Sequence, residues 1–161
     1  MKPPCLPFSS IPSRPGTYVL IMRLDRSPRL QVGKLGSLHS PVGWYTYVGS
    51  ALGPGGLAAR LARHRQREKG LHWHIDYLLA ASDLTEIWWA VSPKRWECAW
   101  AEWLSQMPGA TVPLPGFGAS DCRCPAHLLR FAHRPSASGL AAQLEEPPSL
   151  CCTVLARLTT G

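Results

Sequence analysis

The feature that most constrains the fold is an abrupt change of character at residues 53–56, which read Gly-Pro-Gly-Gly. Three runs rich in β-branched, aromatic and apolar residues precede this breaker: GTYVLIMRL (16–24), LQVGKLG (30–36) and GWYTYVGS (43–50). The polar stretch DRSPR separates the first two, so we expect them to form a hairpin, and we expect the third to be a further strand. After the breaker, Leu57 and Leu61 stand at helical spacing and Gly70 suits a helix end, which predicts a helix over 57–69.

Three more elements are expected further along the chain. The segment HWHIDYLLAA (72–81) favours a helix, although its first residues fit a strand almost as well, and LTEIWWAV (84–91) is typical of a strand. Ser92 and Pro93 fit the start of a helix, which is predicted to reach Met107. Apolar residues recur in it at 3.6-residue spacing: Trp96, Trp100, Trp103, Leu104 and Met107.

The length of 161 residues is typical of a single domain. Five prolines among the first 15 residues predict a flexible leader over 1–14, and an Ala/Ser/Leu/Pro bias predicts a weakly ordered tail over 135–161. The folded domain is then expected to span 15–134.

The apolar pattern predicts a protein without a membrane partner. No apolar stretch approaches the roughly 20 residues that cross a bilayer, and the first residues contain no apolar run of a secretory signal. Without a secretory context, the six cysteines are expected to be reduced thiols. The sequence therefore predicts a cytoplasmic location.

The charge balance favours a partner that carries phosphate. The chain has 17 Lys and Arg against 10 Asp and Glu, and 13 of the 17 basic residues are Arg. Arginine binds phosphate through two parallel N–H donors, so a nucleic acid or a nucleotide is the first candidate. A net charge of +7 can equally serve solubility.

Two tripeptides carry a family resemblance: Gly16-Thr17-Tyr18 in the first strand and Tyr47-Val48-Gly49 in the third. With the Gly-rich turn and the basic helix that follow, this order resembles the GIY-YIG nuclease superfamily. The strings YVGSA, RLARH, HWHIDYLL and GFGASDCRCPAHL are similar to an uncharacterised GIY-YIG-like family, whose members occur alone or attached to a base-excision repair enzyme of the endonuclease III type. The resemblance covers residues 14–134.

The resemblance implies a small α/β (α+β) fold, in which helices flank an antiparallel sheet of three main strands, here with an added hairpin. It also implies hydrolysis of DNA phosphodiester bonds in repair or processing, with one Mg²⁺ or Mn²⁺ ion held by a helix glutamate. Tyr18 and Tyr47 correspond to the paired tyrosines, and Arg60 and His64 belong to the catalytic helix. We expect Tyr47 to act as the base and Tyr18 to place the water or the phosphate. DNA is the implied partner, together with a DNA-repair enzyme.

The geometry of the predicted 92–107 helix selects the metal-binding glutamate. Advancing about 100° per residue from Trp96 places Glu97 beside the apolar stripe and Glu102 near the opposite side. A ligand must face the sheet that carries the tyrosines, so Glu97 is predicted to bind the divalent cation.

The basic residues after Arg60 have two interpretations. Arg63, Arg65 and Arg67 either contact the DNA backbone or form a solvated face. Arg63 and Arg67 are our candidates for nucleic-acid binding. The nearby group of His72, His74 and Asp76 could hold a metal or could form structural hydrogen bonds.

Cys122, Cys124 and His127 place three potential zinc ligands within six residues. Zinc would need a fourth ligand, for which His133 and Cys98 are candidates. A structural role without metal is the alternative, because this spacing is not one of the common zinc patterns and the string belongs to the resemblance.

Two other functions remain open at this point. The chain could be a non-catalytic nucleic-acid-binding domain that retains the fold and the basic helix. It could also be a zinc-stabilised interaction module.

Overall fold

The computed structural model describes residues 2–144 and 149–156 and is built around a five-stranded antiparallel sheet with the strand order β6-β4-β1-β5-β7. Its strands are β1 (Gly16–Leu24), β4 (Gly43–Ala51), β5 (Asp83–Val91), β6 (Leu128–Phe131) and β7 (Cys151–Val154). Two further strands, β2 (Arg29–Val32) and β3 (Gly36–His39), form a separate hairpin. The predicted mixed fold is therefore confirmed, with a wider sheet than the three main strands expected.

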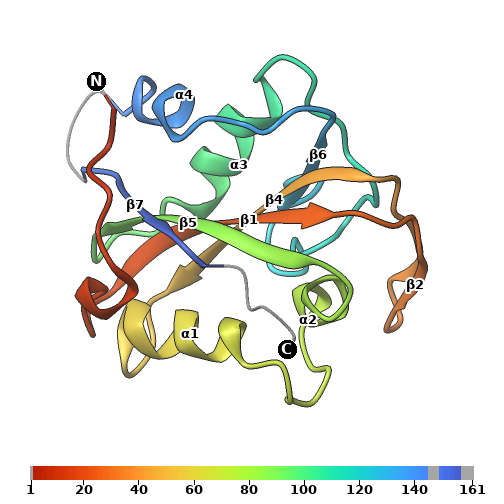
Figure 1. The fold of residues 1–161 in the computed structure, drawn as a ribbon, viewed down its shortest axis with the longest axis horizontal. Helices are drawn as coiled ribbons and strands as arrows, with labels where there is room; N and C mark the ends of the chain where they lie inside the picture. Colours follow the sequence, from red (N-terminus) through yellow and green to blue (C-terminus); the bar gives the residue numbers. More distant parts are fainter. Residues whose placement is uncertain (1, 145–148, 157–161) are drawn as a thin grey trace.

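Helices cover both faces of the sheet (Figure 1). The helices are α1 (Gly56–Arg65), α2 (His74–Leu79), α3 (Glu97–Ser105) and α4 (Ala137–Ala141), together with the short 3₁₀ helix η1 (Phe8–Ser10). One core lies between the sheet and the face of α1 and α2 that carries Leu57, Leu61 and Ile75. The other core lies against α3 and α4 and is centred on Trp88 and Trp100. Alternate residues of each strand enter opposite cores, as the pleat of a sheet requires.

Strand pairing differs from the predicted hairpin of 16–24 with 30–36. β1 pairs with β4 on one side and with β5 on the other, so it is the central strand. The run LQVGKLG contains its own turn at Gly33, which has a positive φ of 50°, and folds back on itself as β2 and β3. A turn glycine inside an apolar run explains why one expected strand became two.

Two helix boundaries differ from the sequence expectation. α1 ends at Arg65, not at residue 69, because Gln66 adopts an extended conformation and the Lys69 ammonium donates to the carbonyls of Arg63 and His64 at 2.9 and 3.0 Å. A lysine side chain thus satisfies carbonyls that a longer helix would have used. α3 begins at Glu97, and Ser92 does not cap it; the Ser92 hydroxyl instead accepts from the Trp96 indole.

Parts of the predicted leader and tail contact the sheet and α1. Pro4 and Leu6 exchange backbone hydrogen bonds with Cys152 of β7, and Ile11 is buried in the core. The carbonyls of Pro12 and Arg14 accept from the first N–H groups of α1, which contains no acidic residue in its first turn. The described parts of 135–161 include α4 and the edge strand β7, whereas residues 145–148 and 157–161 lie outside the described part of the chain.

The second motif glycine allows a close approach between β1 and β4. Gly49 lies opposite Tyr18, and a Cβ at position 49 would stand 2.5 Å from the Tyr18 hydroxyl oxygen. Any larger residue would displace this fully packed ring.

We expect Gly49→Ala to lower the free energy of unfolding by about 1–3 kcal/mol, the range for overpacking a tight core. Chemical denaturation of the two proteins measures the difference. Gly70→Ala is the matched control, because no atom lies within 4 Å of its Cβ position, and it should change stability by less than about 0.5 kcal/mol. Equal stability of Gly49→Ala and wild type would contradict the role given to this glycine.

Candidate functional site

A polar cleft of about 480 Å³ opens where β1, β4, α1 and the start of α3 meet. Five residues singled out from the sequence line it together: Tyr18, Tyr47, Arg60, His64 and Glu97. They come from four different elements and span 80 positions of the chain, so only the fold brings them together. The convergence of all five in one cleft is the central geometric finding of the structure.

The two tyrosines share one face of the sheet because of the β1–β4 register. Tyr18 lies opposite Gly49 and Tyr47 lies opposite Leu20, so both side chains point to the side covered by α1. The Tyr18 side chain is buried, and its hydroxyl shares a 2.7 Å hydrogen bond with Nε2 of His64. The Tyr47 ring is partly exposed and packs edge-on against Phe117, with ring centres 6.1 Å apart.

Burial has the largest effect on the pKa values of the two tyrosines and His64. Burial, reinforced by the neighbouring Tyr47, raises the pKa of Tyr18 well above its usual value. Burial also raises the pKa of Tyr47, as does the Glu97 carboxylate, whereas Arg60 lowers it. Burial and the Lys69 charge lower the pKa of His64 from 6.5 to about 3, so His64 is neutral at physiological pH. The Tyr18–His64 hydrogen bond therefore joins two uncharged groups.

Arg60 keeps its guanidinium at the cleft by stacking it on an aromatic ring. Its Cζ lies 4.4 Å from the centre of the Trp73 ring, and no carboxylate pairs with it among the described residues. A cation held over an indole retains its N–H donors for another anion. Arg60 is thus the basic side chain of α1 that is best placed to meet an anion in the cleft.

Arg63 forms an ion pair within the protein. Its guanidinium donates two hydrogen bonds of 3.0 Å to the two oxygens of Asp76 and lies 4.0 Å from the centre of the Trp73 ring. Backbone N–H groups of His72 and Trp73 also donate to Asp76. Although burial opposes ionisation, these donors hold the pKa of Asp76 at about 2. The buried Asp76 thereby ties α1 to α2, which is the structural interpretation of this group.

The two histidines of the same group face the cleft. His72 and His74 both line it, and Nδ1 of His74 accepts from the backbone N–H of Gly118 at 3.0 Å. This bond attaches the irregular 116–127 loop to α2. Neither histidine contacts Asp76 through its ring in the described structure.

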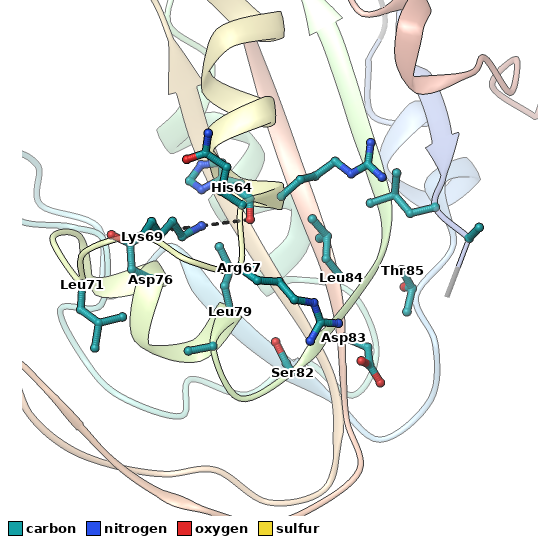
Figure 2. A pocket seen from close by; sticks show the side chains of 15 residues that line it. His64, Arg67, Lys69, Leu71, Asp76, Leu79, Ser82, Asp83, Leu84 and Thr85 are labelled. Atoms are coloured by element: carbon teal, nitrogen blue, oxygen red, sulfur yellow. Dashed lines mark hydrogen bonds and ion pairs between the residues drawn. The ribbon is translucent and has the colours of Figure 1, made fainter. Parts of the chain in front are cut away.

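Arg67 lies away from the cleft, beyond the end of α1. It lines a second pocket of about 270 Å³, where its side chain extends toward Ser82 and Asp83 (Figure 2). The Lys69 hydrogen bond that ends α1 lies at the same pocket. Because the helix stops at Arg65, Arg67 lies outside α1 although the sequence predicts a helix through residue 69.

Glu97 occupies the first turn of α3, with 17% of its side chain exposed toward the cleft. Its Oε1 lies 3.4 Å from Nδ1 of the buried His127. This ring nitrogen makes no hydrogen bond with any described residue. Burial lowers the pKa of His127, but the nearby Glu97 carboxylate and Cys122 together raise it above its usual value. The helical geometry that selected Glu97 over Glu102 is consistent with this position, since Glu102 is exposed.

A second centre lies directly behind Glu97. The sulfur atoms of Cys98, Cys122 and Cys124 and a ring nitrogen of His127 lie within 4.8 Å of one another. Of the two candidates for a fourth ligand, the structure places Cys98 in the group. Four ligand atoms of this kind can bind a metal ion.

The sequence interpretation missed several residues of the cleft wall. Arg95 lies just before α3, and Ser120 and Asp121 lie in the loop before Cys122. The positions of Arg95 and Asp121 in the sequence could have identified them. Arg95 is two positions before Glu97, and Asp121 stands inside the GFGASDCRC string that belongs to the family resemblance.

By its fold and its cleft, the protein is an α+β domain with an open antiparallel sheet and a polar cleft at the start of α3. The chain belongs to the family described as domain of unknown function DUF123, whose model matches residues 17–147. Comparisons with curated proteins and with solved structures found no match. None of the helices within residues 2–144 and 149–156 has the length and apolar character of a membrane span.

The low pKa of His64 predicts a loss of stability in acid. Between pH 6.5 and about 3 the unfolded chain binds a proton at His64 that the folded chain does not, so stability falls as the pH drops through this range. From pH 7 to pH 5 this group should cost about 2 kcal/mol. We expect His64→Gln to remove this part of the loss, as measured by urea denaturation at both pH values. An equal loss in wild type and variant would contradict a buried, neutral His64.

Proposed function

We propose that this protein is a GIY-YIG-type nuclease-like enzyme that hydrolyses DNA phosphodiester bonds in DNA repair or processing with the help of one divalent cation. The observation that carries the proposal is the convergence of Tyr18, Tyr47, Arg60, His64 and Glu97 in one cleft. All five residues are of types that can serve phosphoryl chemistry, and they come from four elements of the fold. The membership in a family of unknown function neither adds to this proposal nor opposes it.

Arg60 is the proposed ligand of the reacting phosphate. Hydrolysis concentrates negative charge on the phosphoryl oxygens in the transition state, and a preorganised cation stabilises that charge. The stacking on Trp73 fixes the guanidinium before substrate arrives, and a fork of N–H donors suits two phosphate oxygens. Arg95 lines the same cleft and adds positive charge along the path of the backbone.

The two tyrosines have different proposed roles because their surroundings differ. The hydroxyl of Tyr18 is fixed by neutral His64, so it serves to position water or phosphate. The Tyr47 side chain lines the cleft, and its hydroxyl makes no hydrogen bond with another described residue. Its phenolate form, which the nearby Arg60 charge favours, is the proposed acceptor of a proton from the attacking water, after the hydroxyl has lost its own proton to solvent. In this reaction water forms a new bond to phosphorus, the bond to the leaving oxygen breaks, and that oxygen takes up a proton.

Glu97 is the proposed ligand of the cation. One carboxylate together with substrate phosphate oxygens is a common way to bind Mg²⁺, and the exposed part of Glu97 faces the cleft. The residues present therefore fit a hard divalent cation. When bound, Mg²⁺ or Mn²⁺ would polarise the phosphate and offset the carboxylate charge that raises the pKa of Tyr47.

The proposal predicts cleavage of DNA that depends on Mg²⁺ or Mn²⁺. Glu97→Gln, Arg60→Ala and Tyr47→Phe should each lower the cleavage rate by at least about 100-fold, because each removes a group that acts on the reacting phosphate or water. The assay uses duplex, nicked, branched and lesion-bearing DNA and records products on a denaturing gel.

Matched controls come from residues of the same types outside the cleft. Glu102→Gln on the exposed side of α3, Arg67→Ala beyond α1 and Tyr77→Phe on α2 should leave the rate within about threefold of wild type. Salt-sensitive binding of DNA without cleavage of any substrate would instead support the non-catalytic nucleic-acid-binding alternative.

A further inference from the structure

Three thiols and one imidazole gather behind the cleft from two distant parts of the chain. Cys98 comes from the first turn of α3, and the other three residues come from the loop before β6. Nε2 of His127 lies 3.4 Å from the sulfur of Cys122 and 3.9 Å from the sulfur of Cys98. The remaining three cysteines of the chain, at 5, 151 and 152, lie outside this group.

These separations match the dimensions of a tetrahedral zinc site. Zn–S and Zn–N bonds of about 2.3 and 2.0 Å at tetrahedral angles separate a sulfur and a nitrogen ligand by roughly 3.5 Å. The measured sulfur–nitrogen distances lie on either side of this value. Three thiolates and one imidazole also form one of the common ligand sets of structural zinc.

The surrounding backbone holds the histidine in place. The backbone N–H of His127 donates to the Phe117 carbonyl at 2.8 Å, and the His127 carbonyl accepts from the backbone N–H of Val48 in β4 at 3.0 Å. The 116–127 loop has almost no regular structure, and the start of α3 has no side-chain cap. A metal bound at this point would fasten an irregular loop and an uncapped helix start to the central sheet.

We propose that Cys98, Cys122, Cys124 and His127 bind one structural zinc ion and that His127 links this site to Glu97. Coordination through Nε2, the nitrogen that faces the sulfurs, leaves the proton on Nδ1. Nδ1 is buried, and Oε1 of the Glu97 carboxylate lies 3.4 Å from it. Carboxylate–histidine–zinc arrangements of this kind fix the orientation of both side chains. The link to Glu97 rests on the proposed function of the cleft, whereas zinc binding does not.

The first test measures the zinc content of the purified protein by elemental mass spectrometry. We expect about one zinc per chain, and replacement by Co²⁺ should give the absorption of a tetrahedral thiolate site. Cys124→Ser should lose most of the zinc after dialysis against a mild chelator, whereas Cys5→Ser, at an exposed cysteine outside the group, should keep it. Wild-type protein that neither contains nor takes up Zn²⁺, or that has a disulfide within this group, would overturn the proposal.

The second test concerns the role of His127. In ¹⁵N-histidine-labelled, zinc-loaded protein, we expect the NMR pattern of an imidazole protonated at Nδ1 and bound to metal at Nε2, and the pattern should disappear on chelation. His127→Cys should keep the zinc through four thiolates but should lower any DNA cleavage by about 10- to 100-fold, because the partner of Glu97 is lost. A metal-bound Nδ1, or unchanged cleavage in His127→Cys, would overturn the link.

The two proposals fail in distinguishable ways. Zinc content and the histidine tautomer are measured without DNA. Zinc-loaded protein that does not cut DNA would oppose only the nuclease function, and active protein without zinc would oppose only this inference.

Discussion

The pairing of β1 with β4 is the constraint on which the rest of the structure depends. Its register places Tyr18 over Gly49 and leaves Tyr47 on the same face two pairs away. A shift of β4 by one residue relative to β1 would move Tyr47 to the opposite core, against α3 and α4, and so separate it from Tyr18. Neither tyrosine ring could reach the cleft from the other face of the sheet. The register of β1 and β4 therefore determines both the need for glycine at position 49 and the presence of the two rings in the cleft.

The buried ion pair of Asp76 and Arg63 transmits this arrangement to the helices. It fixes α2 against α1 and positions Trp73, on which Arg60 also lies. The cost of burying a carboxylate is offset by two guanidinium and two backbone donors, which together satisfy both of its oxygens. Arg63, a sequence candidate for DNA binding, thus helps to hold Trp73 in place, and Trp73 in turn holds Arg60 at the cleft.

The sequence predicted the parts of this protein that depend on local pattern. Strands β1, β4 and β5 and the buried stripe of α3 follow from periodicity, and that stripe also selected Glu97. The strands β6 and β7 were missed because each has only four residues and forms through pairing with distant segments. Arg67 was misplaced because a side-chain cap from Lys69, which no propensity rule contains, ends α1 early. The sequence left His133 and Cys98 as candidates for the fourth member of the cysteine group, because tertiary packing determines which of them lies near Cys122 and Cys124.

The start of α3 connects the two centres of the molecule. Glu97 and Cys98 are consecutive helical residues, and their side chains diverge by about 100°, so one can face the cleft while the other faces the cysteine group. His127 lies between them and is held by the backbone of β4, the strand that carries Tyr47. The tyrosine, the carboxylate and the proposed zinc ligands therefore share one rigid support. With the proposed zinc ion bound, a change that displaces the loop before β6 would also change the position of Glu97 relative to Tyr47.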